Sequence, residues 1–217
     1  MKSKNQLAIE AMQEGKAEEA AKLFQEAIEE DPQDPILYVN FGNLLAGLKD
    51  HKRALKFFNR ALELDETVAT AYYGAANVYY ELENYQEAQL HYQKAIDQGL
   101  VSSDVYYMQG LTLLSLEQPK LALPFMQRAV ELNESDIEAR FQYGMCLASQ
   151  QLLDEAKDQF ERVVEDNSSH ADALYNLGVT YVYKNKISQA KEMFTRAIEA
   201  QSDHQLALHA LSLMENK

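Results

Sequence analysis

The sequence has few of the residues that mark disulfide-stabilised or membrane-spanning proteins. Its 217 residues include one cysteine, Cys146, and no tryptophan. A single cysteine excludes an internal disulfide and fits a reducing compartment. No apolar run reaches the roughly 20 residues of a membrane-spanning helix, and the N-terminus lacks the apolar segment of a secretory signal. We therefore expect a soluble, cytoplasmic protein that has no membrane partner.

Basic residues are scarce relative to acidic ones. The chain carries 20 Lys and Arg against 34 Asp and Glu, which gives a formal net charge of −14 at pH 7. A surface of this sign repels the phosphate backbone of nucleic acids and favours basic partners. Nucleic-acid binding is thus the function class that composition disfavours most.

The dominant feature is a 34-residue repeat that runs without insertion or deletion. A solenoid is the usual meaning of a fixed period of this length. The second half of each copy carries a small, a large and a small residue at repeat positions 20, 24 and 27. The six copies read Ala20, Phe24, Ala27; Ala54, Phe58, Ala61; Ala88, Tyr92, Ala95; Ala122, Met126, Ala129; Ala156, Phe160, Val163; and Ala190, Phe194, Ala197. The predicted repeats span 1–34, 35–68, 69–102, 103–136, 137–170 and 171–204, and 205–217 is predicted to be a C-terminal capping helix.

Each repeat reads as two amphipathic helices, which predicts an all-α fold. In the first helix, positions 4, 7, 8 and 11 share one face. Position 8 is always glycine or alanine, as at Gly42, and a small residue there allows the second helix to approach closely. Asp34 followed by Pro35 predicts a helix start, and Asp136, Ser102, Ser103 and Ser169 can do similar work at later junctions. Pro124 is predicted to fall inside a second helix.

These positions resemble the signature of the tetratricopeptide repeat over essentially the whole chain. Lys4 and Arg140 at position 4 depart from it, and Pro32 is the only proline at position 32. The last repeat shows the signature well, with Leu174, Leu177, Gly178, Tyr181, Ala190, Phe194 and Ala197. The resemblance, strongest to small stand-alone bacterial members, implies a right-handed superhelical solenoid of antiparallel helix pairs. It also implies a scaffold or adaptor role, with first helices lining a concave groove that holds an extended peptide or a partner's helix.

Helix geometry places positions 2, 5, 6, 9, 12 and 13 of each first helix away from the core. Positions 5 and 12 are mostly aromatic or aliphatic: Val39, Tyr73, Tyr107, Phe141 and Tyr175 at position 5, and Tyr80 at position 12. An exposed face of this kind usually marks an interaction site. The alternative is that these side chains pack between neighbouring first helices. For the ladder Tyr73, Tyr107, Phe141 and Tyr175 we favour the groove.

Polar residues on the same face complete the predicted site. Asparagines recur there as Asn40, Asn43, Asn77 and Asn176. A carboxamide can pair with peptide backbone, a role that the resemblance also implies, although capping or solvation would equally explain asparagine. Position 2 is acidic at Asp104, Glu138 and Asp172. These groups would attract a basic ligand, or else would serve only to stabilise helix N-termini.

Catalytic patterns are missing: the five histidines are scattered, and there is no phosphate-binding loop, H-E-x-x-H motif or paired-cysteine spacing. We predict a non-enzymatic, monomeric adaptor without metal or cofactor that binds an extended or helical segment with basic residues and apolar anchors. The alternatives are an architectural module that self-associates and a regulatory or recruiting subunit of a larger complex.

Overall fold

The computed structural model describes residues 2–215, so the last two residues of the predicted segment 205–217 lie outside it. This part of the chain contains thirteen helices and no strand, which confirms the all-α prediction. The chain divides into two compact units, Met1–Glu117 and Gln118–Lys217, which we call the N-terminal and C-terminal halves. The division falls inside the fourth repeat, between its first and second helix.

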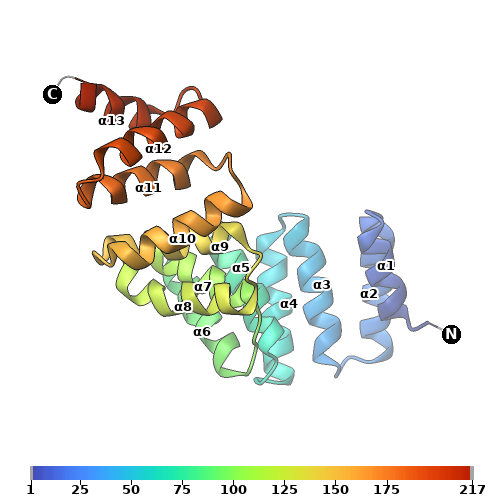
Figure 1. Ribbon diagram of the computed structural model, residues 1–217. Coiled ribbons are helices and arrows are strands. Elements are labelled where there is room, and N and C mark those ends of the chain that lie inside the picture. Colours follow the sequence, from blue (N-terminus) through green and yellow to red (C-terminus); the bar gives the residue numbers. More distant parts are fainter. Residues whose placement is uncertain (1, 216–217) are drawn as a thin grey trace. The chain divides into compact units, whose positions relative to one another are not determined.

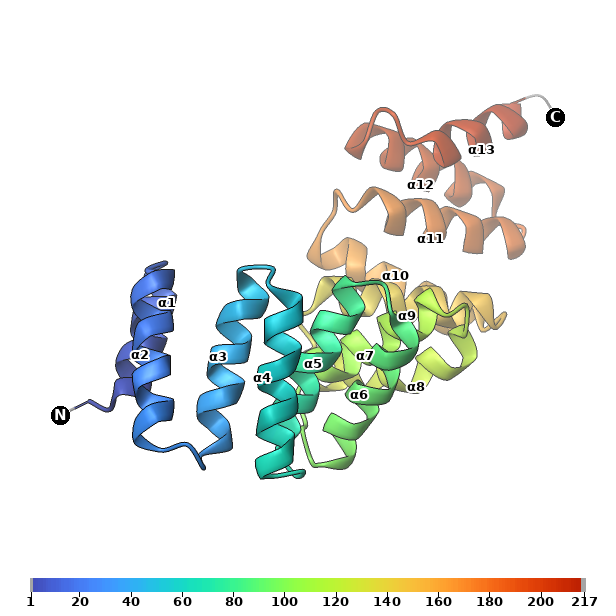
Figure 2. The ribbon, with the colours of Figure 1, turned by 180° about the vertical axis from the view of Figure 1, so that it is seen from behind.

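In the N-terminal half, first and second helices alternate along the chain (Figure 1). Neighbours in sequence lie side by side, as α1 to α4 show in both Figure 1 and Figure 2. The helices are α1 (Lys4–Gln13), α2 (Ala17–Glu30), α3 (Pro35–Gly47), α4 (His51–Leu64), α5 (Ala69–Glu81), α6 (Tyr85–Asp97) and α7 (Ser103–Ser115).

The C-terminal half continues the alternation from a second helix onward. Here α11, α12 and α13 lie side by side in both views (Figures 1 and 2). Pro119 begins α8, and Pro124 lies inside that helix as predicted. The helices are α8 (Pro119–Leu132), α9 (Ile137–Ser149), α10 (Leu153–Asp166), α11 (Ala171–Tyr183), α12 (Ile187–Ala200) and α13 (Gln205–Glu215).

Side-chain caps fix where several first helices begin. The Ile36 N–H donates to Asp34 Oδ1 at 2.9 Å, and Pro35 occupies the first position of α3. The Val105 N–H donates to the Ser102 hydroxyl at 3.3 Å, and the Ala139 N–H donates to Asp136 Oδ1 at 2.9 Å. These bonds satisfy N–H groups that have no partner within the helix. The capping predictions for Asp34, Ser102 and Asp136 are confirmed, whereas the N-cap of α11 is His170 rather than Ser169, and that of α7 is Ser102 rather than Ser103.

A left-handed residue at repeat position 15 connects every first helix to its second helix. The φ angles are 75° at Gly15, 61° at Lys49, 57° at Glu83, 58° at Glu117, 64° at Gln151 and 57° at Asn185. After α3, the Lys49 N–H donates to the Ala46 carbonyl and the Asp50 N–H to the Leu45 carbonyl, both at 2.9 Å. The stabilisation from these two hydrogen bonds outweighs the conformational cost of the left-handed region, which is roughly 1–2 kcal/mol for a residue with a Cβ.

The predicted stripe at positions 20, 24 and 27 forms the core of both halves, and all eighteen side chains are buried. Phe58 illustrates the packing. A Cβ added to Gly42 would lie 2.7 Å from Phe58 Cε1, and one added to Gly74 would lie 2.4 Å from the same atom. The ring therefore occupies space that exists only because both neighbouring first helices carry glycine there.

Candidate functional site: pockets between first helices

Pockets recur at one place in the repeat, between consecutive first helices. Pocket A lies between α1 and α3, pocket B between α9 and α11, and pocket C between α11 and α13. Position 12 of the preceding repeat contributes to each, as Met12 in pocket A and Ala148 in pocket B. Positions 9 and 10 of the following repeat contribute as well, as Asn43 and Leu44 in pocket A. The repeat therefore builds a series of equivalent hollows rather than one unique cleft.

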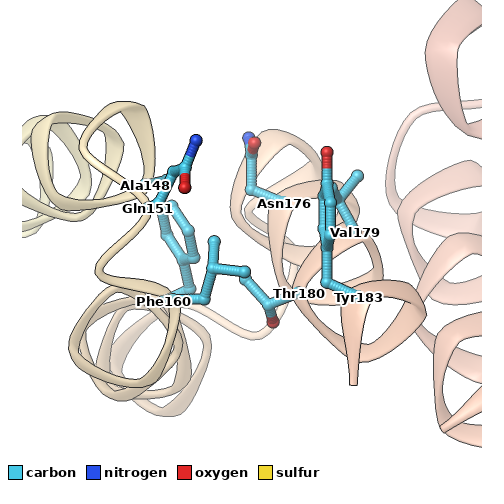
Figure 3. Close-up of a pocket in the computed structure, with 8 residues that line it drawn as sticks. Ala148, Gln151, Phe160, Asn176, Val179, Thr180 and Tyr183 are labelled. Atoms are coloured by element: carbon cyan, nitrogen blue, oxygen red, sulfur yellow. The ribbon is translucent and has the colours of Figure 1, made fainter. Parts of the chain in front are cut away.

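Pocket B has a volume of ≈ 470 Å³ and an apolar floor with a polar edge (Figure 3). The polar ends of Gln151, Asn176 and Tyr183 point to the same side of the pocket, and the Phe160 ring lies below Gln151 (Figure 3). Asn176 Nδ2 donates to the Asp172 carbonyl at 2.8 Å, which fixes the carboxamide and leaves its oxygen available as an acceptor. Tyr183 is 71 % exposed and forms one wall of the pocket.

Pocket C has a volume of ≈ 580 Å³ and is lined only by apolar side chains. Val179 belongs to both pocket B and pocket C, so the two hollows are direct neighbours. The lining consists of Val179, Val182, Ile187, Phe194, Ala210, Leu213 and Met214. Among these, Val182, Ile187 and Leu213 are exposed, which leaves an apolar surface accessible to a partner.

In the N-terminal half, the three predicted site residues of α3 differ in burial and in contacts. Val39 is only 3 % exposed and belongs to the core, so the expectation that it lines an open face is wrong. Asn40 Nδ2 donates to Asn5 Oδ1 at 3.0 Å, a bond between two first helices. Asn43 is exposed and lines pocket A, which has a volume of ≈ 230 Å³.

The predicted aromatic and amide groups of α5 contact each other. The buried Tyr92 hydroxyl donates to Asn77 Oδ1 at 2.6 Å, and the rings of Tyr73 and Tyr92 lie 5.9 Å apart. Burial raises the pKa of Tyr73, an effect that its hydrogen bond with Asn77 opposes. Tyr80 packs edge-on against Tyr85 at 5.4 Å. The carboxamide oxygen of Asn77 is therefore already used within the protein.

On α7, the predicted pair is only partly accessible. Asp104 is exposed, and Tyr107 is half-buried. After burial, the charge of Asp104 also contributes to the raised pKa of Tyr73. These two residues remain consistent with the predicted face.

In the C-terminal half, Phe141 is a core residue, which corrects its assignment to the groove. It is 8 % exposed, and its ring packs against Phe160 at 5.9 Å and His170 at 4.8 Å. Tyr175 is half-buried in the equivalent place, with its ring 5.6 Å from Phe194 and 5.3 Å from His204. The rings of Tyr73, Phe141 and Tyr175 thus pack against position 24 of the second helix in their own repeat.

Sequence reasoning missed the role of the two histidines at position 34. His170 Nδ1 accepts from the Ala173 N–H at 3.2 Å, and His204 Nδ1 accepts from the Ala207 N–H at 3.1 Å. Both imidazoles therefore cap first helices. Because Nδ1 of His204 is the acceptor, its Nε2 carries the proton and donates to Asp172 Oδ1 at 3.1 Å.

The remaining predicted acids are exposed and hold local polar contacts. Gln142 Nε2 donates to Glu138 Oε1 at 2.8 Å, and Asp172 receives the bond from His204 described above. Both carboxylates lie at the surface. Their arrangement is compatible with attraction of a basic ligand as well as with support of the helix N-termini.

The described residues offer neither a metal-binding cluster nor a reactive thiol. Among the described residues, no group of three or more His, Cys, Asp or Glu could hold a metal ion. The Cys146 thiol is buried, and burial raises its pKa to about 11, so it is a poor nucleophile at neutral pH. Within the same range of the chain, every helix is too short or too polar to cross a bilayer.

Comparison with known proteins agrees with the repeat architecture. Family profiles described as tetratricopeptide repeat match residues 33–98, then 73–137, 107–171 and 147–181, and also 2–34 and 171–204. No match was found among curated proteins.

Several solved structures have the same fold. The crystal structure of YrrB, described as a TPR protein with an unusual peptide-binding site, is 56 % identical; the match covers 88 % of this chain and 98 % of YrrB, with a TM-score of 0.84. Pseudomonas aeruginosa pilF matches at 17 % identity over 96 % of this chain and 95 % of its own, with a TM-score of 0.78. MamA matches at 20 % identity over 75 % and 95 %, with a TM-score of 0.68. On the profiles and the YrrB match together, this chain belongs to the tetratricopeptide-repeat family.

Proposed function

We propose that this protein is a non-enzymatic adaptor that binds a polypeptide segment along its first helices, with side chains of the segment seated in the pockets. The observation that carries the proposal is the recurrence of pockets A, B and C at one repeat position. Pockets B and C, both in the C-terminal half, are neighbouring hollows one repeat apart, which suits a ligand that presents two side chains at a matching spacing. The 56 % identity to YrrB, whose structure is described by its peptide-binding site, supports the same function.

The chemistry of pockets B and C defines the ligand we expect. Pocket C is apolar and would take an aliphatic or aromatic anchor. Pocket B offers the Gln151 and Asn176 side chains at its edge, which could pair with the ligand backbone. The net charge of −14 and the exposed acids Glu138 and Asp172 favour basic residues beside that anchor.

Selection from a displayed library of random peptides tests this proposal. The enriched sequences should share apolar anchors flanked by Lys or Arg, and their affinity should fall as salt rises. Val179→Arg should abolish their binding, because Val179 lines both pockets. Leu121→Arg is the matched control, since Leu121 is an exposed leucine of α8 that lines none of the three pockets.

A second substitution tests pocket B alone. Pocket A is small partly because Met12 occupies repeat position 12, where pocket B has Ala148. Ala148→Met should therefore fill pocket B and weaken the selected peptides while leaving the fold intact. Binding that survives both Val179→Arg and Ala148→Met would exclude the first-helix face as the site.

Self-association is a second candidate, because α13 leaves Leu206, Leu208 and Leu213 exposed. A second copy covering them would make the protein an architectural module rather than a monomeric adaptor. Light scattering over a concentration series decides between the two, with Leu206→Lys as the variant that should restore a monomer. A monomer at all concentrations would remove this candidate.

A further inference from the structure

Arg140 is a buried cation at a position where the repeat elsewhere places a mostly apolar or aromatic residue. It occupies position 4 of the fifth repeat, and the same position is Tyr72, Tyr106 and Leu174 in other repeats. The side chain of Arg140 is only 5 % exposed. Arginine keeps its charge in proteins, so burial requires hydrogen bonds and a compensating anion.

The protein supplies the hydrogen bonds only in part and does not supply the anion. Arg140 Nη1 donates to Gln159 Oε1 at 3.2 Å, and Nη2 donates to the Glu134 carbonyl at 2.7 Å. The buried Nε has no acceptor. Within the described residues, no carboxylate forms an ion pair with this guanidinium. A guanidinium has five N–H donors, so three remain for a ligand.

Arg140 lines a pocket between α8, α9 and α10 that shares no residue with pockets A, B or C. Its volume is ≈ 210 Å³, which equals the space of about seven water molecules in the liquid. The lining residues are Gln127, Val130, Glu131, Glu134, Arg140, Tyr143, Gln159 and Arg162. We call it the Arg140 pocket.

Two arginines, Arg140 and Arg162, and two glutamates, Glu131 and Glu134, line this pocket, but among the described residues neither glutamate forms an ion pair with either arginine. Arg162 also lines it and, among the described side chains, forms no ion pair. Glu131 is already held by Arg128 Nη1 at 3.0 Å and by Gln127 Nε2 at 2.9 Å, and its hydrogen bond with Arg128 lowers its pKa. Glu134 presents its backbone carbonyl to Arg140. Tyr143 keeps its hydroxyl proton, because burial raises its pKa, and so offers a further donor.

We propose that the Arg140 pocket binds a carboxylate. A planar carboxylate can accept two parallel N–H bonds from one guanidinium, which suits Arg140 better than a single-point acceptor. The pocket has room for a small dicarboxylate or for the acidic side chain of a partner protein, and the chemistry of recognition is the same for both. Such a ligand would supply the anion that the buried cation lacks, at a place separate from the proposed peptide pockets.

Direct observation of the Arg140 Nε–H group tests the proposal on the wild-type chain. Sodium succinate and the acidic peptide acetyl-Gly-Glu-amide are titrated at constant ionic strength while the arginine side-chain ¹H–¹⁵N resonances are recorded. We expect the Arg140 resonance to shift saturably. If the peptide saturates the shift at a lower concentration than succinate does, the natural carboxylate belongs to a protein side chain. If succinate saturates it at the lower concentration, the natural ligand is a small acid. No saturable shift with either probe overturns the proposal.

Two variants complete the test by thermal unfolding with and without each probe. Arg140→Leu should lose the ligand-dependent rise in Tm, and it should itself unfold at or above the wild-type Tm because it removes an uncompensated buried charge. Arg53→Leu on the exposed face of α4 makes the same change in net charge and should keep the wild-type response. An Arg140→Leu variant that still responds as wild type would overturn the proposal.

Discussion

The two halves of the molecule use the same repeat but fill the space between their first helices differently. In the N-terminal half, pocket A measures ≈ 230 Å³, and Tyr92 extends its hydroxyl to Asn77 on the neighbouring helix. The residue at the position of Tyr92 is Phe24 or Phe58 elsewhere in the N-terminal half and Met126, Phe160 or Phe194 in the C-terminal half, so Tyr92 alone carries a hydroxyl there. Pockets B and C of the C-terminal half measure ≈ 470 and ≈ 580 Å³. Side chains at fixed repeat positions thus decide how large a pocket remains between two consecutive first helices.

The ends of the first helices differ in the same way. Asp34 and Ser102 cap first helices in the N-terminal half, whereas in the C-terminal half Asp136 caps α9 and the histidines His170 and His204 cap α11 and α13. Each histidine also packs against the ring at position 5 of its repeat, Phe141 or Tyr175. The larger cap ties the helix start to the core, so that capping and packing depend on one residue.

The largest expected effect is the loss of unfolding free energy when a buried phenylalanine is removed, and it shows whether the cores of the two halves are packed equally tightly. Phe58 and Phe160 are both fully buried, and removing either ring should cost about 3–5 kcal/mol of unfolding free energy. Urea unfolding of Phe58→Ala and Phe160→Ala, followed by circular dichroism, measures this. A loss below about 2 kcal/mol in one variant would mean that its half relaxes around the cavity and is packed less tightly.

A smaller effect is expected at the glycines that make room for Phe58. Gly74→Ala should destabilise the N-terminal half by about 1–2 kcal/mol, because overpacking outweighs the gain in helix propensity. The added Cβ would lie 2.4 Å from Phe58 Cε1. Gly47→Ala is the control, since a Cβ there meets nothing within 4 Å. Chemical denaturation should show Gly47→Ala to be at least as stable as wild type.

Alkaline unfolding should distinguish Tyr92 from its phenylalanine equivalents. Burial raises the pKa of Tyr92 above its ordinary value of 10.0. The unfolded chain therefore releases this proton first as pH rises, and the folded state holds more protons in that range. The contribution of Tyr92 to the free energy of unfolding is fully present below a pH of about 10. Above that pH the free energy of unfolding should decline by up to about 1.4 kcal/mol per pH unit.

Tyr92→Phe removes this contribution and should flatten the alkaline decline of unfolding free energy. At neutral pH the same variant should lose only about 0.5–1.5 kcal/mol, the value of one hydrogen bond. Parallel urea titrations at neutral pH and above pH of about 10 provide both numbers. An unchanged alkaline slope would show that Tyr92 ionises as readily in the folded protein as in the unfolded chain.

The caps are expected to give the smallest difference between the halves. His204→Ala and Asp34→Ala should each cost about 0.5–2 kcal/mol, the usual range for losing a helix cap. His204→Asn supplies another acceptor and should recover the capping part of the loss, but it cannot restore the ring contact with Tyr175. Thermal unfolding of the three variants separates capping from packing. Full recovery by asparagine would show that the imidazole ring adds nothing beyond the cap.

By itself, the sequence determined the repeat, the helix pairs and the buried stripe, because a 34-residue period and small–large–small spacing leave little freedom in helical packing. It also located the first-helix face that carries Asn43, Asn176 and Tyr183. Helical periodicity assigns a residue to a face, but it does not say how closely the next helix approaches that face.

Only the tertiary structure decided which residues on that face are open. Val39 and Phe141 share repeat position 5 with Tyr175, yet neighbouring helices cover the first two and leave the third half-buried. The left-handed corners at position 15 likewise have no sequence signal beyond Gly15, since Lys49 and Gln151 take the same φ through hydrogen bonds that exist only in the folded chain. The Arg140 pocket has the same origin: Lys4 shares repeat position 4 with Arg140 but is partly exposed and pairs with Glu26 and Glu30, whereas the packing of α8, α9 and α10 leaves Arg140 buried without a counterion.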